Sequence, residues 1–318
     1  MKKGIVIFLI AILVSTSVSF VAADTNFPQK TITVICPWGA GGGTDALARF
    51  IAKLVEQDLK TNVIVVNKTG GNGAVAWAEG AKAKPDGYTV VMTTVEYTLN
   101  PLAGMGSYSL SDYIPILRVN FDPLALVVNA DSGWNTLNDL LNYAKANPDK
   151  STIMAGTYPT VHWLTGILLE EQSGANFNVA GGVGGAAEKI QNLLGKHIDA
   201  IVVSPSEVAQ QVKGGQLKIL AVANDKRDKF FTNVPTFKEL GFDIVLGTWR
   251  GFKLPKGVPQ DVINKIETSF TKAVLSDEYK TFLNTTGFGE GYLNSKDFES
   301  ALKRESDSFK PILLKYKP

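Results

Sequence analysis

The chain has 318 residues, of which 45% are hydrophobic and 19% are charged, and this composition excludes an intrinsically disordered chain and a coiled coil. Its length fits two packed domains better than a single core. Lysine and arginine together number 32, against 30 aspartate and glutamate residues. So even a balance argues against a surface that binds nucleic acid or anionic lipid through its net charge.

Residues 1–23 have the pattern of a secretory signal peptide. Lys2 and Lys3 provide the charged start, an apolar run follows, and small residues at Ala22 and Ala23 predict cleavage before Asp24. We therefore expect a periplasmic or extracellular protein, with an uncleaved membrane anchor as the alternative. The single cysteine, Cys36, cannot form an intrachain disulfide and is expected to be a small buried residue.

The rest of the chain alternates short apolar runs with helical patterns. Residues 32–36 form the first such run, and Leu47, Phe50, Ile51, Leu54 and Val55 then follow at helical spacing. Further apolar runs predict strands at 63–66, 88–92, 124–128, 152–155, 177–180, 199–203 and 218–222, with a later extended stretch at 248–254. Runs that are apolar on both faces and alternate with helices indicate largely parallel sheets flanked by helices, an α/β fold.

Local signals refine this reading of the chain. Thr136 and Asp139 have the spacing of a capping box at a helix start, and Ser204-Pro205-Ser206-Glu207 is a second helix start. Residues 100–120, with two glycines and two prolines, are expected to be irregular. Pro311 is expected to break or distort the last helix.

Four turns rich in glycine or serine lie at strand-to-helix junctions, at residues 39–45, 156–162, 181–186 and 204–206. Ligands of open α/β sheets bind beyond the carboxyl ends of the strands, and helix N-termini attract anions. If two such sheets face each other, these turns converge on one cleft. The sequence therefore predicts an anion site between two lobes.

The sequence carries no signal for a nucleotide, a metal or another cofactor. Thr44 stands where a dinucleotide fingerprint needs its third glycine, and no Walker Gly-Lys-Ser/Thr ending is present. His162 and His197 are the only histidines, and neither belongs to a metal-binding pattern. His197 is expected on the surface. For His162 two interpretations stay open: it fastens its own loop, or it contacts the ligand.

Asp45 and Arg49 are spaced as i and i+4 on the first helix. They either form a surface ion pair that stabilises the helix or place Asp45 against the ligand. Both interpretations remain open at this stage.

Several motifs together resemble the Bug/TctC family, the extracytoplasmic solute receptors of tripartite tricarboxylate transporters. The segment from Pro37 to Asp45 is similar to the first loop of that family. Further similarities cover nearly the whole chain after the signal, at residues 67–73, 85–89, 234–241 and 249–252.

The resemblance implies a two-lobed clamshell of the periplasmic-binding-protein type (type II-like), with a small carboxylate held between the lobes. The expected division is 24–124 and 225–318 in lobe 1 and 125–224 in lobe 2, with hinge crossings near 121–126 and 204–225. The implied function is a receptor, expected to be monomeric, that delivers its solute to integral membrane transporter subunits. A secreted hydrolase using His162 and a solute sensor are the alternatives.

The resemblance also implies that two loops, Trp38 to Asp45 and Gly156 to His162, grip the carboxylate. From the sequence itself we expect side chains deeper in the cleft, at Thr93, Thr94 and Arg250, to choose the solute, and the turns at Gly182 and Ser204 to approach it. Arg250 either pairs with a second carboxylate of the solute or lies on the surface. A dicarboxylate, tricarboxylate, aromatic acid, amino acid or nicotinate-like acid would each fit. The expected residues are Trp38, Gly39, Ala40, Gly41, Gly42, Gly43, Thr44, Asp45, Thr93, Thr94, Gly156, Thr157, Tyr158, Thr160, His162, Gly182, Ser204 and Arg250.

Overall fold

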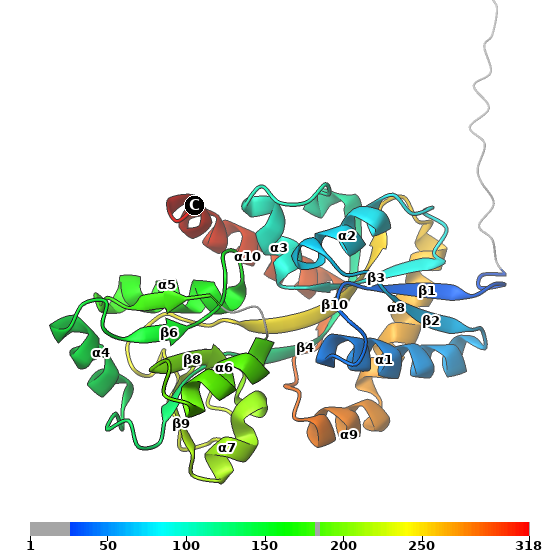
Figure 1. Cartoon of the computed structure of the whole chain (residues 1–318). Coiled ribbons are helices and arrows are strands. Elements are labelled where there is room, and N and C mark those ends of the chain that lie inside the picture. Colours follow the sequence, from blue (N-terminus) through cyan, green and yellow to red (C-terminus); the bar gives the residue numbers. More distant parts are fainter. Residues whose placement is uncertain (1–25, 182–184, 318) are drawn as a thin grey trace, which may run out of the picture.

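The computed structural model describes residues 26–181 and 185–317, which form two lobes that each contain one β-sheet flanked by helices (Figure 1). The expected signal peptide lies outside the described residues. Within the described ranges, no helix combines the length and the hydrophobicity needed to cross a bilayer.

The first sheet has six strands in the order β11-β4-β10-β3-β1-β2. Strands β1, β2 and β3 run parallel, with Val34 opposite Val65 on one side and Val90 on the other. β10 pairs antiparallel with β3 and β4, and β11 pairs antiparallel with β4. The bounds are β1 (Ile32–Cys36), β2 (Val63–Asn67), β3 (Thr89–Thr94), β4 (Tyr113–Pro123), β10 (Gly247–Pro255) and β11 (Leu293–Asn294).

Helices cover both faces of this sheet. On one face, the buried side chains of α1 (Gly43–Leu59), α8 (Gln260–Leu275) and α9 (Asp277–Thr286) form one cluster with the sheet, and this cluster includes the buried Cys36. The other face carries α2 (Ala74–Ala81), α3 (Glu96–Leu102) and α10 (Ser295–Lys315), with short 3-10 turns at η1 (Gly71–Gly73) and η2 (Leu110–Asp112).

The second sheet has the order β7-β6-β8-β5-β9. β6 runs parallel to β7 and β8, whereas β5 is antiparallel to β8 and β9. The bounds are β5 (Ala125–Asn129), β6 (Thr152–Met154), β7 (Asn178–Ala180), β8 (Ala200–Val203) and β9 (Leu217–Val222). α4 (Leu137–Ala146) and α5 (Val161–Ser173) pack on one face, and α6 (Gly185–Leu194), η3 (Pro205–Val208) and α7 (Ala209–Lys213) lie on the other. The α/β fold class is confirmed, and antiparallel strands complete each sheet.

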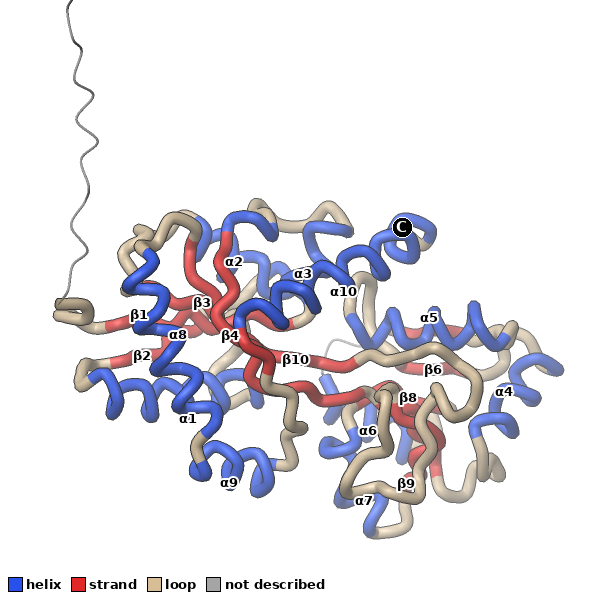
Figure 2. The backbone as a smooth tube through the Cα atoms, turned by 180° about the vertical axis from the view of Figure 1, so that it is seen from behind, coloured by secondary structure: helices blue, strands red, loops and turns tan. Residues whose placement is uncertain are grey.

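The two sheets meet where β4 continues into β5 (Figure 2). At this junction three chain segments lie side by side. The N–H of Leu124 donates to the carbonyl of Leu246 at 3.0 Å, and the N–H of Ala223 donates to the carbonyl of Leu124 at 2.7 Å. The N–H of Leu246 in turn donates to the carbonyl of Ala223 at 3.1 Å. These backbone bonds join the three crossing segments to one another.

Local structure follows some of the sequence signals and departs from others. Thr136 caps α4 as expected, since its Oγ1 accepts from the N–H of Asp139 at 3.2 Å. The expectation of an irregular segment at 100–120 is correct only for 103–109, because α3 extends to Leu102, η2 follows at Leu110–Asp112 and β4 begins at Tyr113. Its Pro115 lies opposite Lys253, beside a register irregularity that spares the proline a ladder bond. α10 also continues through Pro311, where its buried Phe309 and Leu313 pack on lobe 2.

Candidate functional site

A cavity of about 470 Å³ lies between the two lobes, and it is lined by residues of both sheets and of the junction. From lobe 1, the lining includes Trp38, Thr44 and Thr94 among the expected residues. From lobe 2 and the junction, the expected residues in the lining are Gly156, Thr157, Thr160, His162, Ser204 and Arg250. Half of the residues expected from the sequence therefore line one cavity, although they come from positions as far apart as 38 and 250.

The first loop joins β1 to α1 and is held in shape by Asp45. The loop turns at Gly41, whose φ of +80° favours glycine, and α1 begins at Gly43. The N–H of Gly41 donates to Oδ2 of Asp45 at 2.9 Å, and Nδ2 of Asn67 donates to Oδ1 of Asp45 at 2.8 Å. Nε of Arg49 donates to the same carboxylate at 3.0 Å.

Asp45 is 3% exposed and does not line the cavity. Burial alone raises the pKa of its carboxyl, but hydrogen bonds from Arg49, Asn67 and Gly41 outweigh burial and hold the pKa below its ordinary value. Asp45 therefore stays ionised and positions the loop, and its partner Arg49 is half-exposed on the outer side.

The second loop joins β6 to α5 and faces the first across the cavity. Gly156 has a φ of +137°, a backbone conformation that a larger side chain rarely adopts. Thr160 caps α5, since its Oγ1 accepts from the N–H of Trp163 at 3.3 Å and donates to the carbonyl of Thr157 at 2.8 Å. The first turn of α5, which carries His162, therefore begins at the cavity, and the N-terminus of a helix favours an anion.

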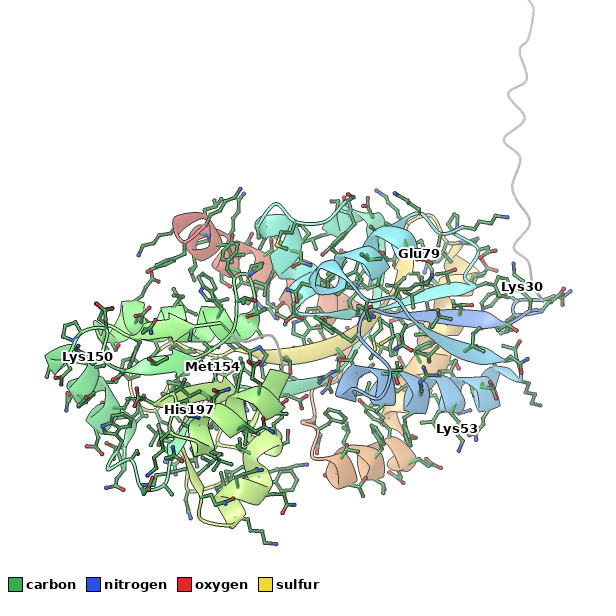
Figure 3. The ribbon with its side chains drawn as sticks, viewed as in Figure 1. Lys30, Lys53, Glu79, Lys150, Met154 and His197 are labelled. Atoms are coloured by element: carbon green, nitrogen blue, oxygen red, sulfur yellow. The ribbon has the colours of Figure 1, made fainter. Side chains whose placement is uncertain are left out.

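His162 lines the cavity, and its imidazole forms no hydrogen bond with any other described residue. Burial and the charge of nearby Lys189 lower the pKa of its imidazole well below 6.5. The ring is therefore neutral at neutral pH and offers one donor and one acceptor to a solute. The only other histidine, His197, is exposed in the turn after α6 (Figure 3).

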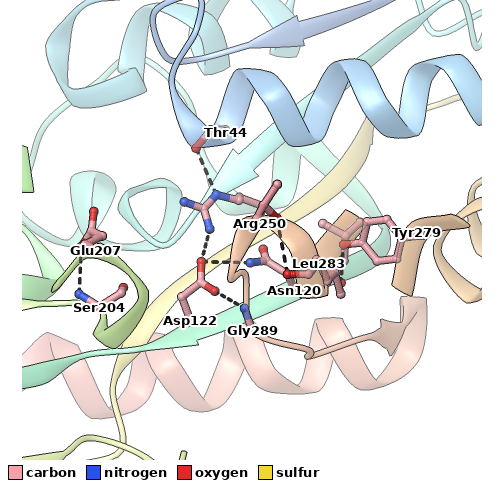
Figure 4. Close-up of polar contacts among 11 residues, drawn as sticks. Thr44, Asn120, Asp122, Ser204, Glu207, Arg250, Tyr279, Leu283 and Gly289 are labelled. Atoms are coloured by element: carbon pink, nitrogen blue, oxygen red, sulfur yellow. Dashed lines mark hydrogen bonds and ion pairs between the residues drawn. The ribbon is translucent and has the colours of Figure 1, made fainter. Parts of the chain in front are cut away.

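Arg250 and Asp122 form an ion pair at the base of the cavity, where β10 and β4 run side by side (Figure 4). The side chains are 13% and 6% exposed. Nε of Arg250 donates to Oγ1 of Thr44 at 3.1 Å, and Asp122 also accepts from Nδ2 of Asn120 at 3.0 Å and from the N–H of Gly289. Nη2 of Arg250 has no hydrogen-bond partner among the described residues, so it is available to an anion.

The remaining expected residues lie outside the lining. Residues Gly39 to Gly43 are exposed in the first loop. They lie between Trp38 and Thr44, which do line the cavity. Thr93 is buried in the sheet, where its hydroxyl donates to the carbonyl of Gly251 at 3.3 Å. Tyr158 turns toward α10, and its hydroxyl donates to the carbonyl of Leu313 at 3.2 Å. Gly182 lies outside the described residues.

Residues 47–317 match the protein family described as the tripartite tricarboxylate transporter family receptor, TctC. This chain belongs to the TctC family. A relative from Cupriavidus necator, the "UPF0065 protein in gbd 5'region", is 32% identical over 279 residues, which are 87% of this chain and 84% of the relative.

Solved structures of similar proteins agree with this assignment. A TctC solute-binding protein from Polaromonas, without ligand, has a TM-score of 0.81 and is 36% identical. The match covers 91% of this chain and 100% of the Polaromonas chain. MatC of Rhodopseudomonas palustris, with bound malate, has a TM-score of 0.75, and the match covers 90% of this chain and 100% of MatC. Because its sequence is only 20% identical, it supports the fold alone. The resemblance found in the motifs is therefore confirmed, and this TctC receptor is a solute-binding protein, not an enzyme.

Four charged residues of the receptor line the cavity but were missed in the sequence: Glu96, Asp122, Lys189 and Glu207. Glu96 and Asp122 come at or just after strand ends, which is the one signal that could have found them. Glu207 was read only as part of a helix cap, and its carboxylate does accept from the N–H of Ser204 at 2.9 Å. Lys189 sits inside α6, where nothing in the pattern distinguishes it.

Replacing Asp45 with Ala tests its role in positioning the first loop of the receptor. We expect a loss of about 2 kcal/mol in the free energy of unfolding, because three donors lose their shared acceptor. Urea unfolding of the variant measures this loss. Asp277→Ala is the control, since that side chain is 95% exposed and should cost far less. Equal stability of the two variants would contradict the assignment.

Proposed function

We propose that this receptor captures a small organic carboxylate between its two lobes and delivers it to the membrane subunits of a tripartite transporter. The observation that carries the proposal is the convergence of anion-binding groups on one cavity. Helix starts reach it at Thr44 and Thr160, and the guanidinium of Arg250 lies at its base. Helix N-termini and arginine both favour carboxylates.

The family relationship supports the two remaining parts of the proposal. Receptors of this family serve tripartite transporters, so integral membrane subunits are the partner that we propose. The signal pattern of residues 1–23 supports a location outside the cytoplasm. We also propose that the receptor acts as a monomer.

We further propose that the lobes close about the junction near Leu124. Lobe 1 then comprises residues 24–124 and the C-terminal part, and lobe 2 begins at 125. Residues 225–246 pack beside the second sheet, as the backbone bonds of Phe237 to Val222 and of Leu246 to Ala223 indicate. We therefore place the return to lobe 1 at Gly247, later than the boundary at 224. Hinge closure over a ligand is a common motion of two-lobed binding proteins.

A thermal-shift screen of organic acids against the mature chain tests the proposed function. A carboxylate present at about 100 times its Kd should stabilise the receptor by about 2.7 kcal/mol, which raises Tm by about 5 °C. Alcohols and amides of the same carbon skeletons serve as controls and should leave Tm unchanged. The proposal fails if no acid of the screen raises Tm above these controls.

A further inference from the structure

Glu96 is a buried carboxylate at the cavity that has no cationic partner among the described residues. It starts α3, is 6% exposed and lines the cavity. Its Oε2 accepts from Oγ1 of Thr94 at 2.7 Å, and Oγ1 of Thr94 accepts from Nε1 of Trp38 at 3.4 Å. Neutral donors therefore orient the carboxylate, and no described cation forms an ion pair with it, although the charge of Arg250 acts on it from a greater distance.

The cations of the cavity are engaged elsewhere. Arg250 is paired with Asp122. Lys189 is 5% exposed, and its Nζ donates to the carbonyls of Ala155 at 2.7 Å and Val202 at 2.9 Å. Both cations line the cavity together with three carboxylates, those of Glu96, Asp122 and Glu207.

With a neutral imidazole at His162, the charged lining carries one more negative charge than positive when every carboxylate is ionised. A solute with two carboxylates would add two negative charges to this excess. Unpaired like charges in a desolvated site are costly, so such a solute requires protonation of the site or of itself.

We infer that the solute is an amino carboxylate, whose carboxylate is held by Arg250 and the helix starts while its ammonium group pairs with Glu96. This inference rests on the proposed function and selects one class from the acids that a carboxylate grip admits. The ammonium supplies the counter-charge that the buried Glu96 lacks, and three N–H donors suit an oxygen already oriented by Thr94. Glu96 then determines specificity, because an acid without an amine leaves it unpaired.

The competing possibility is a protonated Glu96 that donates to a second carboxylate of the solute. Burial raises the pKa of Glu96, which favours protonation while the cavity is empty. The two possibilities differ in what Gln at this position would do. An amide has the shape and the donor of a protonated carboxyl group, but it cannot carry the negative charge that attracts an ammonium group.

Calorimetry on the mature wild-type receptor with matched acids is the first test. The pairs are glutarate and glutamate, butyrate and 4-aminobutyrate, and 3-phenylpropionate and phenylalanine, which differ only by the amine. We expect at least one amino acid to bind at least 30-fold more tightly than its amine-free partner. The inference is overturned if every amine-free acid binds as well as its partner or better. If no acid binds at all, the proposed carboxylate function fails with it.

Glu96→Gln is the second test. The variant should lose at least 30-fold in affinity for the preferred amino acid and change less than threefold, or gain, toward its amine-free partner. The control is Glu278→Gln, an exposed acid on α9, which should change neither affinity. Unchanged affinity of Glu96→Gln for the amino acid would overturn the inference. If this variant does not fold, the wild-type pairs alone decide.

Discussion

Replacing Arg250 with Ala is expected to weaken carboxylate binding by about 100-fold and to cost about 3 kcal/mol in the free energy of unfolding. The affinity falls because the variant loses the guanidinium at the base of the cavity, with its open Nη2. The stability falls because Asp122, whose side chain is 6% exposed, keeps its charge and loses its cation. Calorimetry and urea unfolding measure the two losses separately.

The two effects can be separated with a second substitution. In Arg250→Ala combined with Asp122→Asn, the stranded charge is gone, so we expect most of the stability to return while the affinity stays low. Arg227→Ala is the control, because its pair with Glu239 is about half-exposed and should be worth less than about 1 kcal/mol. If Arg250→Ala binds its solute within threefold of wild type, Arg250 has no part in binding and the ion pair is structural.

The loops of the cavity could be predicted from the sequence because their signals are local. Each of the three signals, the glycines after β1, the turn before α5 and the helix start at Ser204, is contained within a few consecutive residues. Such spacing reflects the backbone conformation itself, and the backbone decides where a helix begins.

Side-chain direction was harder to predict than backbone position. Thr93 and Thr94 are adjacent on β3, and both were expected at the ligand. Successive side chains of a strand point to opposite faces. Thr94 accordingly lines the cavity, whereas Thr93 binds the carbonyl of Gly251 inside the sheet.

The charge balance of the cavity could not be predicted, because it depends on contacts between distant segments. Arg250 reaches Thr44 across 206 residues and Asp122 across 128. Those contacts follow from the place of β10 between β3 and β4, an order that periodicity does not specify. For the same reason the sequence left open whether Arg250 lay on the surface, and the structure places it in the lining.

A second buried charge, Lys253, should leave a mark on the pH dependence of stability. This residue of β10 is 2% exposed, and its Nζ lies 4.4 Å from the ring centroid of Tyr97 and 5.0 Å from that of Phe298. Burial lowers the pKa of the amine to about 7, although Glu305 and Glu299 oppose the shift. The unfolded chain retains a lysine pKa near 10.4.

The sign of the effect follows from these two pKa values. Between about pH 7 and pH 10 the unfolded chain binds a proton at Lys253 that the folded chain does not, so stability rises with pH in this window. Below pH 7 both states are charged at this position, and the folded state bears the full penalty of burying the charge. Burial also lowers the pKa of Lys189, to about 8. Lys189 therefore adds a second increase of stability with pH, which begins at about pH 8.

Lys253→Met removes this titration while conserving most of the side-chain volume. We expect the variant to be more stable than wild type at pH 6, on the order of 4 kcal/mol, and to lose that advantage progressively up to pH 10. Urea unfolding across this range measures the difference between the two curves. That difference contains the titration of Lys253 together with its effect on Glu305, because burial raises the pKa of this carboxyl to about 7 and the charge of Lys253 opposes that shift. Lys280→Met is the control, since that side chain is 60% exposed and its removal should shift both ends of the range equally. A constant difference for Lys253→Met would mean that the amine stays charged in the folded protein, held by the two aromatic rings as a cation.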